Sequence, residues 1–166
     1  MSPYRLFIGL GSNLSEPLEQ LRAAWHNIEQ HPLFQRSEAS PIYRSLPVGP
    51  GPQDDYLNAV VSTYSCAEPL AILDALQTIE QRQGRQRTLR WGPRTLDLDL
   101  LLADEMKLNH PRLCLPHPRL QERNFALIPL LDLAPDARLP DGTCLNRLPA
   151  ARSWDGLSST SLTWKH

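Results

Sequence analysis

The sequence predicts an α+β fold in which an antiparallel sheet is covered by helices, with the element order β-α-β-β-α-β of ferredoxin-like proteins. Two observations indicate this order. Four segments have the apolar and β-branched composition of strands, and a segment with helical spacing separates the first from the second and the third from the fourth. The chain has 166 residues, of which 41% are hydrophobic, enough for the core of one domain.

The first half of this order lies before residue 44. Residues 4–11 (YRLFIGLG) predict a strand that runs into a Gly-Ser-Asn turn, for which a structural role is expected. A helix is expected over residues 17–30, with Ser15 as its N-cap, because apolar residues then recur at helical spacing. Residues 35–43 predict a second strand that is interrupted or lies at an edge, since Pro41 has no N–H to donate.

The second half follows a long loop. Residues 44–55 (RSLPVGPGPQDD) are rich in proline and glycine, and a loop of this length favours a functional role. Residues 56–64 predict the third strand, and residues 69–84 predict a helix that begins at a proline and ends near a glycine. Residues 95–103 (TLDLDLLLA) predict the fourth strand.

A C-terminal extension completes the chain. Residues 106–108 and 113–115 could pair as a short hairpin, and residues 119–133 are expected to be largely helical, with a break at their proline. We expect a single domain over residues 1–157 and a flexible tail over residues 158–166.

Composition and charge exclude several classes of protein. The net charge of −1 gives no global reason to expect nucleic acid or a membrane as a partner, and no apolar segment approaches the roughly 18 residues that span a bilayer. Three widely spaced cysteines without a CxxC pair indicate reduced thiols, and the N-terminus lacks the pattern of a signal peptide. A cytoplasmic protein is therefore expected.

The aspartates of the fourth strand are the first candidate site. In a strand, Asp97 and Asp99 share one face with Thr95, while the leucines between them face the other way. Their Cα atoms are then roughly 6.5 to 7 Å apart, so the carboxylates can converge on Mg²⁺. A solvated sheet face is the alternative, but the leucine run that follows indicates a central strand.

Arginines precede these aspartates. Fifteen of the 17 basic residues are arginine, and no acidic residue lies between Glu80 and Asp97. The arginines of this region are Arg82, Arg85, Arg87, Arg90 and Arg94. Guanidinium groups beside a carboxylate pair are suited to a Mg-polyphosphate. A solvated basic loop is the alternative, and RNA binding is disfavoured because Trp91 is the sole aromatic residue there. Neither a P-loop nor the kinase motif set is present, so arginines and metal would bind the phosphates.

Two further groups could contribute. His117 lies between two prolines and precedes Arg119 and Arg123, so its imidazole could contact phosphate or could be structural. Tyr56 and Asn58 share a strand face beside the Pro/Gly loop and could line a pocket for a flat, hydrogen-bonding ligand. The aromatic rings of Trp91 and Phe125 could stack on such a ligand or belong to the core.

The segment RWGPRTLDLDLLL, together with GLGSNL near the N-terminus, resembles the 6-hydroxymethyl-7,8-dihydropterin pyrophosphokinases of folate biosynthesis. The resemblance runs from about residue 4 to residue 147 and includes LPVGPGPQDDYLN and LPHPRLQERNFALIPL. It implies a ferredoxin-like α/β/α sandwich, usually monomeric, that transfers the β,γ-pyrophosphate of ATP to the hydroxymethyl group of the pterin and releases AMP.

The resemblance also implies a role for each matching residue. The residues implied in catalysis are Arg85, Arg94, Asp97 and Asp99, of which the two aspartates would hold two Mg²⁺ ions. Those implied in ATP binding are Gln77, Glu80, Arg87, Trp91, Arg94, Arg112, His117 and Arg123. Those implied in pterin binding are Ser45, Leu46, Val48, Tyr56, Asn58, Trp91, Asp97 and Phe125. Metal coordination can lower the pKa of the attacking hydroxyl, so no general base is assigned.

Some positions depart from the family's commoner pattern. The basic loop is about one residue shorter than in some relatives, which leaves open whether Arg87 or Arg90 contacts phosphate. Cys114 stands where a threonine is frequent, and Pro118 where an aromatic residue is common. A two-metal phosphohydrolase or nuclease and a non-catalytic nucleotide-binding module are the alternative functions.

Overall fold

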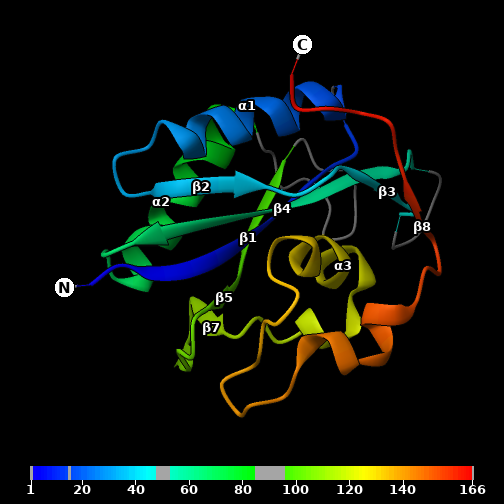
Figure 1. Cartoon of the computed structure of the whole chain (residues 1–166). Coiled ribbons are helices and arrows are strands. Elements are labelled where there is room, and N and C mark those ends of the chain that lie inside the picture. Colours follow the sequence, from blue (N-terminus) through cyan, green and yellow to red (C-terminus); the bar gives the residue numbers. More distant parts are fainter. Residues whose placement is uncertain (1, 15, 48–52, 85–95, 166) are drawn as a thin grey trace.

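The computed structural model describes residues 2–14, 16–47, 53–84 and 96–165. Its main sheet has the order β5-β1-β4-β3-β8, with β2 also paired to β4, and the described pairs are antiparallel. The strands of this sheet are β1 (Tyr4–Ser12), β2 (Gln35–Ala39), β3 (Tyr43–Ser45), β4 (Tyr56–Ser65), β5 (Asp97–Ala103) and β8 (Leu157–Ser159). Figure 1 shows β1 and β4 side by side at its centre.

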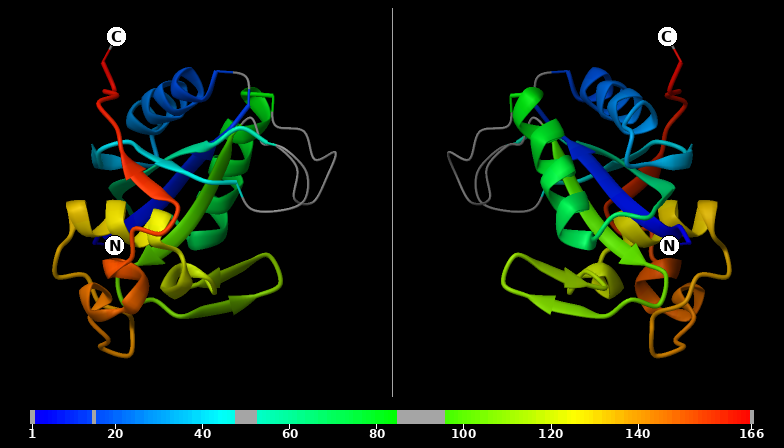
Figure 2. Two further views of the ribbon diagram at one scale, coloured as in Figure 1. Left: turned by 90° about the vertical axis from the view of Figure 1, so that its right-hand side faces the viewer. Right: turned by 90° about the vertical axis from the view of Figure 1, so that its left-hand side faces the viewer.

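Helices cover both faces of this sheet. The helices α1 (Pro17–Glu29) and α2 (Pro69–Arg82) pack on one face, and α3 (Asn124–Leu133) packs on the other (Figure 2). A separate hairpin pairs β6 (Leu108–His110) with β7 (Leu113–Leu115). Three short 3-10 turns are η1 (Leu120–Glu122), η2 (Leu145–Arg147) and η3 (Pro149–Arg152). No helix in the described part of the chain is long and apolar enough to cross a membrane.

Two hydrophobic clusters follow from the alternation of side chains along the strands. Leu6, Ile8 and Leu10 of β1 are buried against α1 and α2, whereas Phe7 points to the α3 side. Burying one such side chain stabilises the fold by about 1.5 to 3 kcal/mol. The central strand is therefore anchored on both faces.

The predicted element order is confirmed, with differences in detail. The second strand is interrupted at Pro41, as expected, and becomes β2 and β3. Pro129, however, lies buried inside α3 and does not break it. The helix forgoes one backbone hydrogen bond at this position and gains apolar contact in exchange. Ser15 lies outside the described residues, and Glu16 occupies the N-cap position of α1 without a side-chain cap bond.

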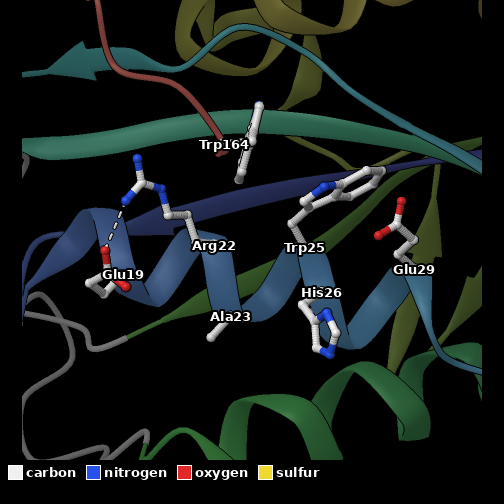
Figure 3. A pocket seen from close by; sticks show the side chains of 7 residues that line it. All are labelled: Glu19, Arg22, Ala23, Trp25, His26, Glu29 and Trp164. Atoms are coloured by element: carbon white, nitrogen blue, oxygen red, sulfur yellow. Dashed lines mark hydrogen bonds and ion pairs between the residues drawn. The ribbon is translucent and has the colours of Figure 1, made fainter. Parts of the chain in front are cut away.

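The end of the chain differs from the expectation of a flexible tail after residue 157. Strand β8 continues to Ser159, and the indole N–H of Trp164 donates to the carbonyl of Ser40 at 2.8 Å. The ring centroids of Trp164 and Trp25 are 6.1 Å apart, and Figure 3 shows Trp164 facing α1. The guanidinium of Arg22 also donates to two carbonyls of this segment. The Trp164 ring and the Arg22 guanidinium thus join residues 163–165 to the link between β2 and β3 and to α1, through contacts that the sequence does not predict.

Replacing Trp164 with alanine is expected to lower the free energy of unfolding by about 2 kcal/mol. The substitution removes the indole hydrogen bond and the contact with Trp25, and a partly buried aromatic ring contributes less than a fully buried one. Urea unfolding followed by circular dichroism measures the change. The neighbouring exposed Lys165→Ala is the control, and equal stability of the two variants would restore the flexible-tail interpretation.

Candidate active site

A row of paired residues crosses the sheet on the α3 side. Asp97 of β5 lies opposite Gly11 of β1, Gly11 opposite Asn58 of β4, and Asn58 opposite Tyr43 of β3. Directly opposed residues of antiparallel strands point to the same face. A Cβ atom at Gly11 would lie 3.2 Å from Nδ2 of Asn58. The Asn58 amide therefore occupies the space that this glycine leaves open, between the carboxylate and the rest of the row.

The two aspartates lie as the strand period predicts. Asp97 and Asp99 are partly buried on the α3 side of the sheet, whereas Leu96, Leu98 and Leu100 are buried on the side of α1 and α2. Opposite the aspartates stand Gly11 and Gly9, so no side chain of β1 fills the space beside them. The described residues contain no cluster of three or more acidic, histidine or cysteine side chains. Two carboxylates on one face of a strand fit the chemistry of Mg²⁺, which seldom takes a full set of protein ligands.

A buried hydrogen bond joins two polar side chains on the same face, two strands away from the carboxylates. The hydroxyl of Ser45 donates to Oδ1 of Asn58 at 2.5 Å, and both side chains are buried. This bond fixes the amide orientation, so Nδ2 is the edge that lies over Gly11. Tyr56 pairs with Ser45 in the sheet and is partly buried. The structure thus brings together three residues that the sequence assigns to one pocket.

Helix α3 packs beside β3, the strand that carries Ser45. Phe125, in the first turn of α3, packs on the cluster of Tyr43, Ile128 and Leu157. The Leu46 side chain is 61% exposed, and its backbone N–H donates to the Gly156 carbonyl at 3.0 Å. The backbone group of Leu46 that can serve a ligand is therefore its carbonyl.

Of the predicted Gly-Ser-Asn turn, Gly11 and Ser12 belong to β1, because both pair with β4, and only Asn13 follows the strand. The buried Asn13 side chain donates to Oε1 of Gln53 at 3.2 Å and to the backbone carbonyl of Asp54 at 3.1 Å. These bonds join the end of β1 to the last residues of the Pro/Gly loop. The residues that lead into Tyr56 and β4 are therefore held against the end of β1.

Two of the residues implied in ATP binding meet between α2 and the β6–β7 hairpin. The Arg112 guanidinium contacts Oδ1 of Asp74 at 2.5 Å and Oε1 of Gln77 at 3.3 Å. Asp74, which the sequence reading missed, could have been found as the acid one helical turn before Gln77. The salt bridge is exposed on both sides, so it orients Arg112 more than it stabilises the fold.

Glu80, implied in ATP binding, makes a buried contact with β5. Its side chain is 6% exposed, and Oε2 accepts the backbone N–H of Leu98 at 2.8 Å. Strand β5 ends the described sheet on this side, so an N–H that points away from β1 has no strand to pair with. Glu80 supplies the missing acceptor and supports β5 between its two aspartates.

His117 is held as a neutral hydrogen-bond donor. Burial, with Arg123 and Arg119 nearby, lowers the pKa of His117 from 6.5 to about 4. Its Nδ1 accepts the N–H of Arg119 at 3.1 Å, so the neutral ring carries its proton on Nε2. The backbone N–H of His117 donates to the Leu101 carbonyl at 2.8 Å. The imidazole therefore lies close to β5 with one N–H to offer.

The His117→Asn variant is expected to lose less stability in acid than the wild-type chain. Because the folded-state pKa of His117 is about 4, below the ordinary 6.5, the unfolded chain binds a proton between these values that the folded chain does not. This contribution to stability is complete above pH 6.5 and falls as the pH drops toward 4. Asparagine can still accept the Arg119 N–H but does not titrate. Urea unfolding at pH 7 and 4.5 measures the difference, and an equal acid loss in both proteins would contradict it.

Several predicted site residues lie outside the described part of the chain. These are Val48, Arg85, Arg87, Arg90, Trp91 and Arg94. One groove of about 420 Å³ lies elsewhere, between α1 and the C-terminal segment (Figure 3). It is lined by Trp25, Trp164 and charged residues of α1, none of which the sequence assigns to the site.

The fold defines the class: a ferredoxin-like α+β protein whose antiparallel sheet has helices on both faces and carries two aspartates on one face of β5. The family model described as 7,8-dihydro-6-hydroxymethylpterin-pyrophosphokinase (HPPK) matches residues 7–135. The chain belongs to this family of transferases.

Relatives of known name agree over nearly the full length. The chain is 51% identical over 153 residues to the 2-amino-4-hydroxy-6-hydroxymethyldihydropteridine pyrophosphokinase of Pseudomonas aeruginosa, which covers 92% of this chain and 94% of that protein. The enzyme of the same name from Haemophilus influenzae is 44% identical over 142 residues, covering 86% and 89%.

Solved structures agree on the fold. An HPPK-DHPS crystallised in complex with substrates superposes with a TM-score of 0.74 at 12% identity, covering 96% of this chain and 47% of that one. A Plasmodium falciparum HPPK-DHPS triple mutant with pteroate gives a TM-score of 0.69 at 12% identity, covering 95% and 47%. The chain spans about half the length of these bifunctional proteins.

Proposed function

We propose that the site around Asp97 and Asn58 transfers the β,γ-pyrophosphate of ATP to the hydroxymethyl group of 6-hydroxymethyl-7,8-dihydropterin and releases AMP, a step of folate biosynthesis. The observation that carries this proposal is the row Asp97, Gly11 and Asn58 across three adjacent strands. In this row a carboxylate and an amide point to the same face with one strand between them, which supports metal binding by the first and pterin binding by the second. Donor and acceptor substrates then meet at one point of the sheet.

Asp97 and Asp99 would hold two Mg²⁺ ions at this point. When bound, such ions neutralise phosphate oxygens and lower the pKa of a coordinated hydroxyl. The rest of the task is positioning and charge neutralisation by protein groups, which is characteristic of phosphoryl transfer.

The ATP side is formed by residues that approach β5 from α2, the hairpin and the segment before α3. His117 would donate its Nε2–H to a phosphate oxygen and, being neutral, needs no proton change near pH 7. Arg112 and Gln77, already in contact, would bind the nucleotide together. Arg123 lies over the Phe125 ring at 5.6 Å and so stands between the two substrates. From the resemblance, Arg85, Arg87, Arg94 and Trp91 would add to this side.

The pterin side is formed by Ser45, Asn58, Tyr56 and Phe125. Asn58 would present Nδ2 to an acceptor on the heterocycle, because Ser45 already holds Oδ1. Phe125 would stack on the ring face, with Trp91 opposite it, and the carbonyl of Leu46 and the backbone of Val48 would bind the ring edge. A flat, nitrogen-rich heterocycle has both the ring face and the edge groups that these residues require.

The decisive experiment is an assay of AMP formation with each component omitted in turn. We expect AMP to form from ATP only when both 6-hydroxymethyl-7,8-dihydropterin and Mg²⁺ are present. AMP formation without the pterin would indicate a hydrolase instead. Nucleotide binding with no product under any of these conditions would indicate a non-catalytic module.

A further inference from the structure

We propose that Asn124 is a positioning residue for the pterin pocket and acts by holding the C-terminal turn of residues 153–156, here called the C-terminal bracket, between β3 and α3. The inference rests on the proposed function, because it concerns the pocket that the pterin would occupy. It adds a residue and a segment that lie outside the set implied by the resemblance.

The first step is the contact between α3 and the C-terminal bracket. Asn124 is the first residue of α3 and directly precedes Phe125. Its Nδ2 donates to the carbonyl of Ser153 at 3.0 Å and to the carbonyl of Asp155 at 2.9 Å. The Asn124 amide therefore donates both of its N–H groups to carbonyls of the bracket.

The second step is the contact between the bracket and β3. The carbonyl of Gly156 accepts the N–H of Leu46 at 3.0 Å, and Leu157 pairs with Ser45 in the sheet. The Leu157 N–H closes the turn on the Trp154 carbonyl at 3.0 Å. Gly156 has φ +68°, a conformation that favours glycine, and a Cβ there would lie 3.5 Å from Cδ1 of Leu46. The bracket is thus fixed at both ends.

The consequence is geometric. Ser45 and Leu46 form one wall of the pocket and Phe125 forms another, and the bracket joins these walls through hydrogen bonds with no part in binding. The walls also meet through apolar contacts of Tyr43, Ile128 and Leu157, and the Tyr43 hydroxyl donates a hydrogen bond to the Asp132 carboxylate of α3. These contacts hold the later turns of α3, whereas the two Asn124 bonds set the distance and angle of its first residue, next to Phe125. Loss of the bonds should therefore change the fit of the pterin more than the stability of the core.

The Asn124→Asp variant tests this inference. Aspartate has the same shape but carries no N–H, so its oxygens would face two carbonyl oxygens and both bonds would be lost. We expect the KM for the pterin to rise about tenfold, since a misplacement of about 1 Å at a binding group is costly. The KM for ATP and the kcat at saturating pterin should change less than the KM for the pterin, since Arg112, Gln77 and His117 stand on other elements and only Arg123 adjoins Asn124.

The matched control is Asn146→Asp. The Asn146 amide also donates to a backbone carbonyl, that of Pro135, at 3.1 Å, but it has no contact with the pocket residues. It should leave the KM of both substrates unchanged. A second variant, Gly156→Ala, strains the same bracket from the β3 end and should repeat the pterin-selective effect.

The outcomes are distinct. Equal pterin KM values for the Asn124 and Asn146 variants, or a parallel rise for ATP and pterin in the Asn124 variant, would overturn the positioning role. A wild-type chain that forms no AMP would overturn the proposed function itself. Titration of pterin in the presence of a non-hydrolysable ATP analogue gives the same comparison as dissociation constants, with no contribution from the chemical step.

Discussion

Replacing either Asp97 or Asp99 with asparagine is expected to lower the rate of AMP formation by about 10²- to 10³-fold, the usual cost of losing one preorganised electrostatic contact to the transition state. Asparagine keeps the size and one oxygen of the aspartate but removes the negative charge. Both positions are partly buried on the α3 side of β5, opposite glycines of β1. The substitutions therefore change the charge at the proposed metal site with little change in packing.

The control for this pair is Asp104→Asn, one residue beyond the end of β5. The Asp104 carboxylate accepts the backbone N–H of Arg5 at 3.1 Å, and an asparagine oxygen can do the same. Its φ of +43° is also one that asparagine tolerates. This variant should keep the wild-type rate. The Mg²⁺ concentration for half-maximal rate should rise in the Asp97 and Asp99 variants and not in the Asp104 variant. Wild-type rates in both β5 variants would remove the metal-site argument.

Features that follow a local period could be predicted from the sequence. The two-residue period of a strand puts Asp97 and Leu98 on opposite faces. The structure confirms this, because Leu98 is buried in the core under α1 and α2 and Asp97 is only partly buried. The element order could be read in the same way, because each helix and strand carries its own apolar pattern. The interruption at Pro41 was predictable because proline has no N–H.

Contacts between distant residues could not be predicted in this way. The Asn58 amide occupies the space of Gly11, and Asn124 holds carbonyls about thirty residues further along. No local pattern encodes either pairing, since each depends on which strands become neighbours. The alternation of Leu162 and Trp164 is too short to predict that the tail packs on α1. For the contact of Asn58 the sequence offered one signal, Gly11 itself, because a glycine inside a strand indicates the close approach of another group.

Glu80→Ala is expected to lower the free energy of unfolding by about 2 to 3 kcal/mol, because it leaves the N–H of Leu98 without its charged acceptor. It should also lower the rate of AMP formation by about tenfold or more. Leu98 lies between Asp97 and Asp99, so a shift of the backbone at this point moves both carboxylates. A displacement of about 1 Å at a reacting centre is enough for such a loss. Urea unfolding and the AMP assay measure the two effects on the same preparation.

The Glu80→Gln variant distinguishes two roles of Glu80, support of strand β5 and contact with the nucleoside of ATP. Glutamine retains an oxygen that can accept the Leu98 N–H, so this variant should keep most of the stability and most of the rate. Glu29→Ala, an exposed acid at the equivalent end of α1, should change neither. If Glu80→Ala raised the KM for ATP while leaving stability and kcat intact, Glu80 would act on the nucleotide, as the resemblance implies. If stability and kcat fell together and glutamine restored both, its function would be to fix the strand that carries the two aspartates.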